Sequence, residues 1–209
     1  MISFASVGVE SMAIYKKDLS PDPFKQFIKW YTDVHDLGVF EYDAMTLATA
    51  TLSGRPSCRT VLLKSVTDGF IFHTNYESRK GIELAKNPQA AAVFYWKEVG
   101  RQVRIEGRVT KISREESAAY FARRPRESQI GAVASFQDRP LSSREELEEA
   151  FVRVSSRYED QEVPIPNYWG GYSLIPECFE FWEAREHRLH DRFEYTKSSN
   201  GWVIQRLSP

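Results

Sequence analysis

The chain has little cysteine, and its cysteines are not spaced as disulfide partners or zinc ligands are. Cys58 and Cys178 are its two cysteines, they lie far apart, and neither belongs to a Cys-x-x-Cys pair. Disulfide frameworks and structural zinc sites need paired or closely spaced cysteines, so the sequence argues against both. A chain without disulfides fits a reducing compartment, and we expect a cytoplasmic protein.

Long apolar segments and an excess of one charge are also missing. The longest apolar run, residues 90–96, is too short to cross a bilayer, and no basic region followed by a long apolar run opens the chain. The 28 Lys+Arg nearly balance the 29 Asp+Glu, giving a formal net charge of -1. No overall field draws such a chain to nucleic acid or to an anionic membrane. We expect neither partner, and any anion site has to be local.

The common catalytic motifs are absent too. The sequence contains no Gly-x-Ser-x-Gly elbow, no His-Glu-x-x-His, no clustered Cys and His ligands and no Gly-x-Gly-x-x-Gly turn. Hydrolysis through a serine nucleophile, metal catalysis and a Rossmann dinucleotide site are therefore disfavoured. With 42% hydrophobic residues among 209 and no repeat or linker, the chain is expected to form a single domain over 1–209.

What is present is a pattern of short strands joined by turns, with helices between them. Alternation and turn residues predict strands over 45–51, 58–65, 70–74, 90–96, 102–112, 177–183, 188–195 and 202–207. Capping residues and helical spacing predict helices over 22–38, 77–86, 113–121, 127–135 and 142–158, with a loop over 164–171. This order, without regular β-α-β alternation, favours a mainly β protein: a closed or nearly closed barrel with attached helices.

The octapeptide 186–193 carries an unusual set of cations. If it is a strand, Arg188, His190 and Arg192 line one face. Guanidinium groups bind phosphate oxygens in bidentate geometry, so this stripe predicts a phosphorylated ligand. A charged edge strand that protects against aggregation is the alternative, and this segment alone does not decide between the two.

Three further segments suit an anionic ligand. Arg59 and Lys64 bracket an apolar strand, although cations at strand ends also occur simply because their long side chains reach solvent. The strand-to-helix junction 74–80 combines backbone amides, hydroxyls and two cations, as phosphate sites do and as ordinary capped helices do. Around Pro125, three arginines lie between Tyr120 and Ser128, which is either an exposed basic patch or an anion site.

The chain thus has several phosphate-suited clusters but neither a nucleophile nor a metal site. This combination indicates that a bound cofactor does the difficult chemistry while the protein orients it. Trp182 could stack on a flat ring of such a cofactor, although a tryptophan in a strand is more often part of the core.

The clusters belong to an ordered series of motifs that runs from Asp18 to Pro209. They are Arg59-Thr-Val-Leu-Leu-Lys64, Thr74-Asn with Ser78-Arg-Lys80, Arg101-Gln-Val103, Tyr120-Phe with Arg124-Pro-Arg-Glu-Ser128-Gln-Ile-Gly131, Trp169-Gly-Gly171, Phe181-Trp182, Arg188-Leu-His-Asp-Arg192 and Arg206-Leu-Ser-Pro209. Taken together, they resemble the pyridoxine/pyridoxamine 5′-phosphate oxidase family of flavin enzymes.

The resemblance implies an FMN-binding split β-barrel that works as a homodimer, with both subunits contributing to each flavin site. By position, the residues expected to bind FMN are Arg59, Val61, Leu62, Lys64, His73, Thr74, Arg79, Lys80, Gln102, Gln137, Trp182 and Arg192. Those expected to bind the phosphorylated B6 substrate are Lys64, Tyr120, Arg124, Ser128, Arg188 and His190, the last two as catalytic residues. The implied reaction moves a hydride from substrate C4′ to flavin N5, and O2 then becomes H2O2.

The chain departs from the family pattern in three places. Glu183-Ala184 follows Trp182 where the family usually has Gln-Gly, and Asp138 follows Gln137 where Ser is common. Upstream of Asp18 there is no Arg-x-x-Tyr pattern, and we expect residues 1–17 to form a mobile arm. Two rival functions stay open. One is an FMN oxidase for another substrate, such as a phenazine precursor, against which the Arg188-Leu-His-Asp-Arg192 segment and the phosphate-suited cluster weigh; the other, favoured by Glu183 and Asp138, is a non-catalytic binder of flavin or pyridoxal phosphate.

Overall fold

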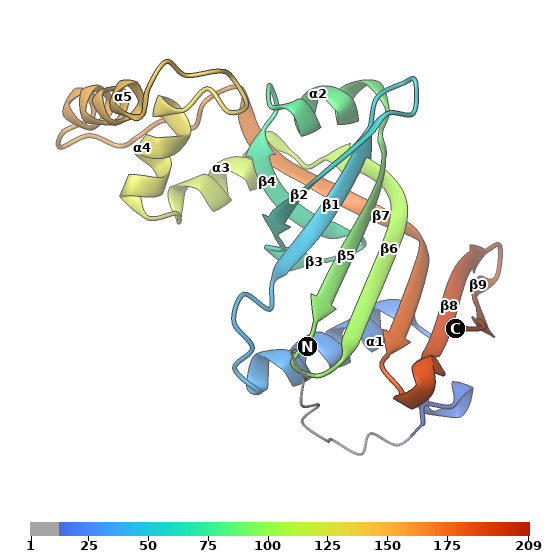
Figure 1. The fold of residues 1–209 in the computed structure, drawn as a ribbon. Coiled ribbons are helices and arrows are strands. Elements are labelled where there is room, and N and C mark those ends of the chain that lie inside the picture. The colour runs from blue at the N-terminus through green and yellow to red at the C-terminus, as the bar shows by residue number, and fades with distance from the viewer. Residues whose placement is uncertain (1–12) are drawn as a thin grey trace.

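The computed structural model describes residues 13–209 and consists mainly of one antiparallel sheet that curls into a half-barrel (Figure 1). Its strands are β1 (Ala44–Ala50), β2 (Pro56–Leu62), β3 (Ser65–Val66), β4 (Phe70–Asn75), β5 (Gln89–Trp96), β6 (Arg101–Lys111), β7 (Trp169–Glu183), β8 (Asp191–Ser198) and β9 (Gly201–Arg206). Its α-helices are α1 (Pro23–Asp36), α2 (Arg79–Lys86), α3 (Arg114–Ala122), α4 (Arg126–Ala134) and α5 (Arg144–Arg157). The mainly β fold class predicted from the sequence is confirmed.

The sheet has nine strands in the order β2-β1-β5-β6-β7-β4-β3, and β8 and β9 continue from β7. The long strand β7 makes this branching possible. The first part of β7 pairs with β4, and its last part pairs with β8. On the other side, β6 pairs with β7 over the whole length of β6. The sheet therefore splits at β7 into two arms (Figure 1).

Alternation along the strands builds the barrel core. On β6, Val103 and Ile105 are buried while Arg104 and Glu106 point outward, as a strand with one buried face requires. Helix α1 begins where Asp22 accepts a hydrogen bond from the N–H of Phe24 at 2.9 Å, and it packs three buried apolar side chains into the same core. These are Phe27, Trp30 and Val34.

Helices α3, α4 and α5 lie together at one side of the barrel (Figure 1) and enclose a second, smaller apolar core. Phe121, Ile130 and Val163 form it with Trp169, the first residue of β7. A reciprocal capping box between Ser113 and Glu116 fixes the start of α3. The second core therefore attaches the helical unit to the strand that divides the sheet.

The predicted strand over 188–195 is wrong at its start. Residues Glu186–Arg188 form a short 3-10 turn, and β8 begins at Asp191. His187 and Arg188 have left-handed backbone angles, with φ of 54° and 61°, which a strand does not contain. Arg188, His190 and Arg192 therefore do not form one stripe along a strand. The predicted loop 164–171 also ends early, because β7 starts at Trp169.

The N-terminal arm predicted over 1–17 lies outside the described residues up to residue 12. Within the described part, the N–H of Ile14 donates a hydrogen bond to the Asp191 carboxylate at 3.0 Å. Arg206 bonds the same carboxylate at 2.6 Å and also the Ile14 carbonyl. These contacts join the start of the described chain to β8 and β9. No helix within residues 13–209 is long and apolar enough to span a membrane.

A glycine is required at position 107, where the pairing of β6 with β7 shifts in register. The shift falls between Glu106 and Gly107, and a Cβ at Gly107 would lie 2.0 Å from the Ile175 carbonyl oxygen. We expect Gly107→Ala to destabilise the fold by about 2 kcal/mol or more, because backbone must move to relieve the overlap. Thermal unfolding should show a Tm lower by roughly 5 °C.

The matched control is Gly131→Ala, because a Cβ at Gly131 in α4 meets nothing within 4 Å. Alanine favours a helix more than glycine does, so this variant should unfold at the same temperature or slightly higher. Equal losses in both variants would contradict the close approach of β6 and β7.

Candidate active site

A cavity of about 970 Å³ lies where β2, β4, α2, α3 and α4 meet, with the loop after α4 closing one side. Many of the residues predicted for flavin and substrate line it. They are Arg59, Val61, Leu62, Lys64, His73, Thr74, Arg79, Lys80, Tyr120, Arg124, Ser128 and Gln137. The cavity therefore brings together segments that are far apart in the sequence.

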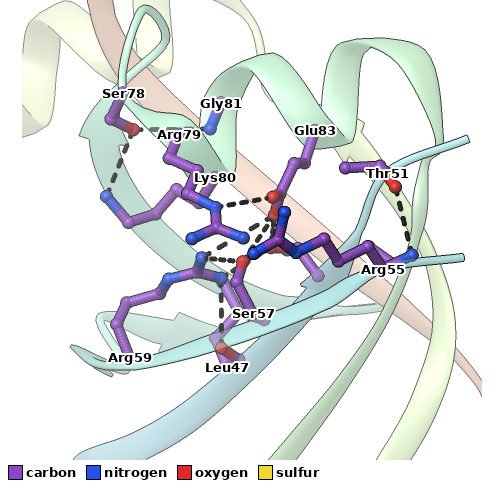
Figure 2. Close-up of polar contacts among 12 residues, drawn as sticks. Leu47, Thr51, Arg55, Ser57, Arg59, Ser78, Arg79, Lys80, Gly81 and Glu83 are labelled. Atoms are coloured by element: carbon purple, nitrogen blue, oxygen red, sulfur yellow. Dashed lines mark hydrogen bonds and ion pairs between the residues drawn. The ribbon is translucent and has the colours of Figure 1, made fainter. Parts of the chain in front are cut away.

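The cations at one end of the cavity are held by hydroxyl groups. Ser78 caps α2, and the Lys80 ammonium donates to the Ser78 hydroxyl at 3.1 Å (Figure 2). It also donates to the Thr74 hydroxyl at 3.1 Å. Lys80 is buried, and burial lowers the pKa of its ammonium. A buried cation next to a helix N-terminus favours an anionic ligand such as a phosphate.

Arg59 and Arg79 approach a single buried carboxylate, that of Glu83 in α2 (Figure 2). Glu83 accepts hydrogen bonds from Thr49 at 2.5 Å, from Ser57 at 2.7 Å and from Arg79 Nε at 2.9 Å. Burial alone would raise the pKa of Glu83, but these hydrogen bonds outweigh it and lower the pKa to about 2. Glu83 is thus an anion that stabilises the hydroxyls and cations around it.

The pKa of Glu83 makes a prediction about acid stability. Because the carboxyl titrates at about 2 when folded and near 4.5 when unfolded, its contribution is complete above pH 4.5 and is lost as pH falls toward 2. We expect Glu83→Gln to be less stable than the parent at pH 7 by about 2 to 3 kcal/mol.

The difference between the two proteins should shrink when the pH is lowered from 5 to 3, as measured by urea unfolding at each pH. Arg153 and Glu149 provide a control pair on exposed α5, where Glu149→Gln should leave the pH dependence unchanged. A constant difference between Glu83→Gln and the parent over this range would contradict the lowered pKa.

At the other end of the cavity, flat side chains stack on one another. His73 lies against Tyr120, with ring centroids 4.0 Å apart, and against Trp169 at 5.2 Å. The Arg124 guanidinium lies 4.8 Å from the Trp169 ring centroid. Burial and the charges of Arg124 and Lys64 lower the pKa of His73 to about 4, so its imidazole is neutral at pH 7.

Several polar atoms of this stack are buried without a hydrogen-bond partner in the described residues. They are both ring nitrogens of His73 and Nη1 of Arg124. Buried polar groups in folded proteins are normally satisfied, so these orphaned atoms indicate that a polar ligand completes the site. Together with the cations around Lys80, these groups would suit a cofactor phosphate and a second anionic molecule.

The departure at Asp138 lies inside this cavity. Its carboxylate accepts a hydrogen bond from the N–H of Arg79, at the start of α2, at 2.8 Å. Gln137, its neighbour, accepts from Thr74 at 3.3 Å. An acidic side chain is stabilised at a helix N-terminus, which explains how the chain accommodates the extra negative charge beside Lys80.

The remaining predicted residues lie elsewhere, on β6, β7 and β8 and in the segment that joins β7 to β8. The strand register places Gln102 of β6 beside Trp182 of β7, and Trp182 beside Arg192 of β8. The His190 ring contacts Trp182 with a centroid distance of 4.6 Å. We call this set, with Arg188, the sheet group. It lies at the end of β7 remote from α2, α3 and α4 (Figure 1).

The side chains of His190 and Arg192, two members of the sheet group, make hydrogen bonds within the chain. The N–H of Arg185 donates to His190 Nδ1 at 3.1 Å, so Nδ1 is unprotonated and Nε2 carries the proton of the neutral ring. Arg192 binds both oxygens of Glu180, at 2.8 and 3.1 Å. Arg188 is exposed and has a left-handed backbone, a conformation that is costly for a non-glycine residue and concentrates at functional sites.

The departure at Glu183 is accommodated by ion pairs. Glu183 is 3% exposed and contacts Arg101 and Arg185, each at 2.9 Å. Arg185 in turn contacts Asp191 at 2.6 Å, so this carboxylate is part of a network that fixes the segment leading to His190. The carboxylate that replaces the usual amide is therefore compensated by two guanidinium groups.

Within one chain, the structure does not bring the sheet group to the cavity. Lys64 and Arg124 line the cavity, and Arg188 does not.

The sequence analysis did not single out Glu83, because a single acidic residue in an amphipathic helix is usually part of its solvent-exposed face. The spacing of Arg79 and Glu83, four residues apart on α2, was the available signal.

A curled antiparallel half-barrel with helices beside a cation-lined cavity defines the class of split β-barrel proteins. The chain belongs to the pyridoxamine 5′-phosphate oxidase family. The family model "Pyridoxamine 5′-phosphate oxidase" matches residues 37–158, and "Pyridoxine 5′-phosphate oxidase C-terminal dimerisation region" matches residues 169–209. The family membership that the motifs predicted is therefore confirmed.

Similar curated proteins cover nearly the whole chain. The pyridoxine/pyridoxamine 5′-phosphate oxidase of Rubrobacter xylanophilus is 52% identical over 90% of this chain and 88% of its own length. That of Burkholderia cenocepacia is 53% identical over 97% of this chain and 96% of its own length.

Among solved structures, PhzG from Burkholderia lata 383, in complex with tetrahydrophenazine-1-carboxylic acid, matches with a TM-score of 0.89. The two are 31% identical, and the match covers 95% of this chain and 98% of that one. A pyridoxamine 5′-phosphate oxidase-related, FMN binding protein from Nostoc punctiforme matches with a TM-score of 0.72 at 19% identity, over 90% of this chain and 97% of that one, which shows a shared fold.

Proposed function

We propose that this chain is an FMN-dependent oxidase that converts pyridoxamine 5′-phosphate and pyridoxine 5′-phosphate to pyridoxal 5′-phosphate. The observation that carries the proposal is the cavity with cations at one end and the Arg124 and His73 stack at the other. Such a cavity would suit the anionic groups of two phosphorylated molecules. The curated relatives of the same family, at about half identity, support the same activity.

The chain's own residues would bind and orient the two molecules. Arg79 and Lys80 suit the flavin phosphate because they lie at the hydroxyl-rich start of α2. Arg59 of β2 suits it too, because it lines the same cavity and is held by the hydroxyls of Thr49 and Ser57. Arg124, with Tyr120 and Ser128, suits the substrate phosphate. Bound FMN would supply a hydride acceptor at N5 for the hydrogen at substrate C4′, O2 would take up the electrons as H2O2, and with the amine substrate water would hydrolyse the resulting imine to the aldehyde and ammonia.

The sheet group would complete each site from the partner subunit. The C-terminal match to a dimerisation region supports a homodimer, and a two-fold axis can place one chain's sheet group against the other chain's cavity. Trp182 and Arg192 would then contact flavin. Arg188 and the Nε2–H of His190 would hold the substrate and position its reacting carbon. Proximity and electrostatics of this kind account for much of the rate of cofactor enzymes.

We propose further that the protein is a single domain over residues 1–209 and works in the cytoplasm.

The direct test of the proposed function is spectroscopic. The purified protein should be yellow, and its flavin absorbance should bleach when pyridoxamine 5′-phosphate is added without air and return with H2O2 release when O2 is admitted. Unphosphorylated pyridoxamine is the matched control and should bleach the flavin much less. A colourless protein, or bleaching without preference for the phosphate, would contradict the proposal.

A second candidate keeps the barrel and the flavin but changes the substrate. It is supported by the close structural match to PhzG, which was solved with a phenazine compound. The cluster of Lys64, Tyr120, Arg124 and Ser128 around the cavity favours a phosphorylated substrate instead. Turnover of a substrate panel separates these two oxidases, and the absence of peroxide with every substrate would favour a non-catalytic flavin binder.

A further inference from the structure

Glu83 does not line the cavity, yet it contacts the groups that orient one cavity cation. Its carboxylate is 5% exposed and lies behind Ser57 and Arg59. The strand register places Thr49 of β1 directly opposite Ser57 of β2, with Arg59 two residues further along β2. Helix α2 lays Glu83 over this pair (Figure 2).

The two hydroxyls have a fixed direction of hydrogen bonding. An ionised carboxylate only accepts, so Thr49 and Ser57 each donate their single hydroxyl proton to Glu83, at 2.5 and 2.7 Å. Their lone pairs are then left to accept from Arg59. Nη1 donates to Thr49 and Nη2 to Ser57, both at 2.6 Å.

This arrangement leaves one edge of the guanidinium available for a ligand. Nη1 also donates to the Leu47 carbonyl at 3.2 Å, so both of its hydrogens are used. Of the five hydrogens that a guanidinium carries, the Nε hydrogen and one Nη2 hydrogen have no hydrogen-bond acceptor among residues 13–209. Nε and Nη2 form an edge that binds a phosphate in bidentate geometry.

We propose that Glu83 is a positioning residue that, through the hydroxyls of Thr49 and Ser57, orients Arg59 toward the phosphate of the flavin. The same carboxylate binds Arg79 Nε at 2.9 Å and restrains a second cation at that end. This inference rests on the proposed function, because it takes the phosphate of FMN as the anion.

The direction in which Glu83→Gln changes the affinity for FMN distinguishes a positioning role of Glu83 from a direct electrostatic effect on the phosphate. Removing a negative charge near a phosphate would by itself tighten FMN binding. Loss of orientation would weaken it. We expect Glu83→Gln to raise the Kd for FMN about tenfold, the scale of one charge-assisted hydrogen bond, while the Kd for riboflavin, which lacks the phosphate, stays within about twofold.

The experiment titrates the full-length protein, stripped of flavin, with FMN and with riboflavin and follows flavin fluorescence. Thr49 is buried and does not line the cavity, so it supplies a matched pair of variants. Thr49→Val removes the hydroxyl with little change in shape and should weaken FMN selectively. Thr49→Ser keeps the hydroxyl and should bind both flavins as the parent does. If Glu83→Gln does not fold, this pair decides.

Two results would overturn the inference: tighter FMN binding by Glu83→Gln, or an unchanged ratio of the Kd values for FMN and riboflavin, whether both rise equally or neither changes. Each leaves the proposed function standing if the parent binds FMN and oxidises pyridoxamine 5′-phosphate. A parent that binds neither flavin would instead overturn the proposed function together with this inference.

Discussion

Arg124→Ala is expected to weaken binding of pyridoxamine 5′-phosphate by about 1.5 to 3 kcal/mol, a factor of roughly ten to one hundred in Kd. Nη1 of Arg124 is buried without a partner in the described residues, and burial lowers the pKa of the guanidinium. A buried nitrogen of a cation without a hydrogen-bond partner is costly, and a phosphate would relieve that cost. The measurement is substrate Kd for the flavin-loaded protein, together with KM.

Arg123 provides the matched control, because it adjoins Arg124 but is exposed and bonds the carbonyl of Ala119 in its own helix. Arg123→Ala should leave Kd and KM unchanged. FMN affinity should stay the same in both variants. If Arg124→Ala binds phosphorylated and unphosphorylated substrate with the parent's selectivity, the assignment of Arg124 to the substrate phosphate is wrong.

Arg188→Ala and His190→Ala are expected to lower turnover by roughly 100-fold, the scale of losing one well-placed contact to the reacting molecule. The flavin should remain bound, because the cavity cations are untouched. The Nε2–H of His190 is directed by the hydrogen bond that Nδ1 accepts from Arg185, so His190→Gln, which can still donate, should retain more turnover than His190→Ala. Stopped-flow flavin reduction measures this step.

His187 supplies the control for Arg188. Its side chain is 85% exposed, and it shares the left-handed backbone. Asparagine adopts that backbone readily, so His187→Asn should keep both the turn and the turnover. Loss of flavin in Arg188→Ala, or full turnover in both Arg188→Ala and His190→Ala, would contradict the assignment.

Much of the fold follows from local signals in the sequence. Asp22 and Ser113 do cap helices, and alternation along β6 does separate a buried from an exposed face. These features are local because a cap or a pleat needs only neighbouring residues. The turn at 186–188 could not be found in this way. Alternating cations are typical of a strand, and the two successive left-handed residues lie between Arg185 and Asp191, whose ion pair spans the turn.

The sequence predicted the residue types of the candidate site but not how they are arranged in space. Cations, hydroxyls and aromatic rings around Arg59, Lys80 and Arg124 are typical of anion sites, and the structure gathers them in one cavity. Their meeting depends on the sheet order, which no single segment encodes. The role of Glu83 depends on the packing of α2 over β1 and β2, so the residue itself carries no local sign of it.

We propose above that each active site takes its cavity from one subunit and its sheet group from the other. The most direct test is a heterodimer in which one subunit carries Arg124→Ala and the other Arg188→Ala, isolated through two different affinity tags. One site then carries both changes and the other carries neither, so about half of the parent activity is expected. Activity as low as that of the two variant homodimers would show that Arg124 and Arg188 act within the same chain, and would contradict the account.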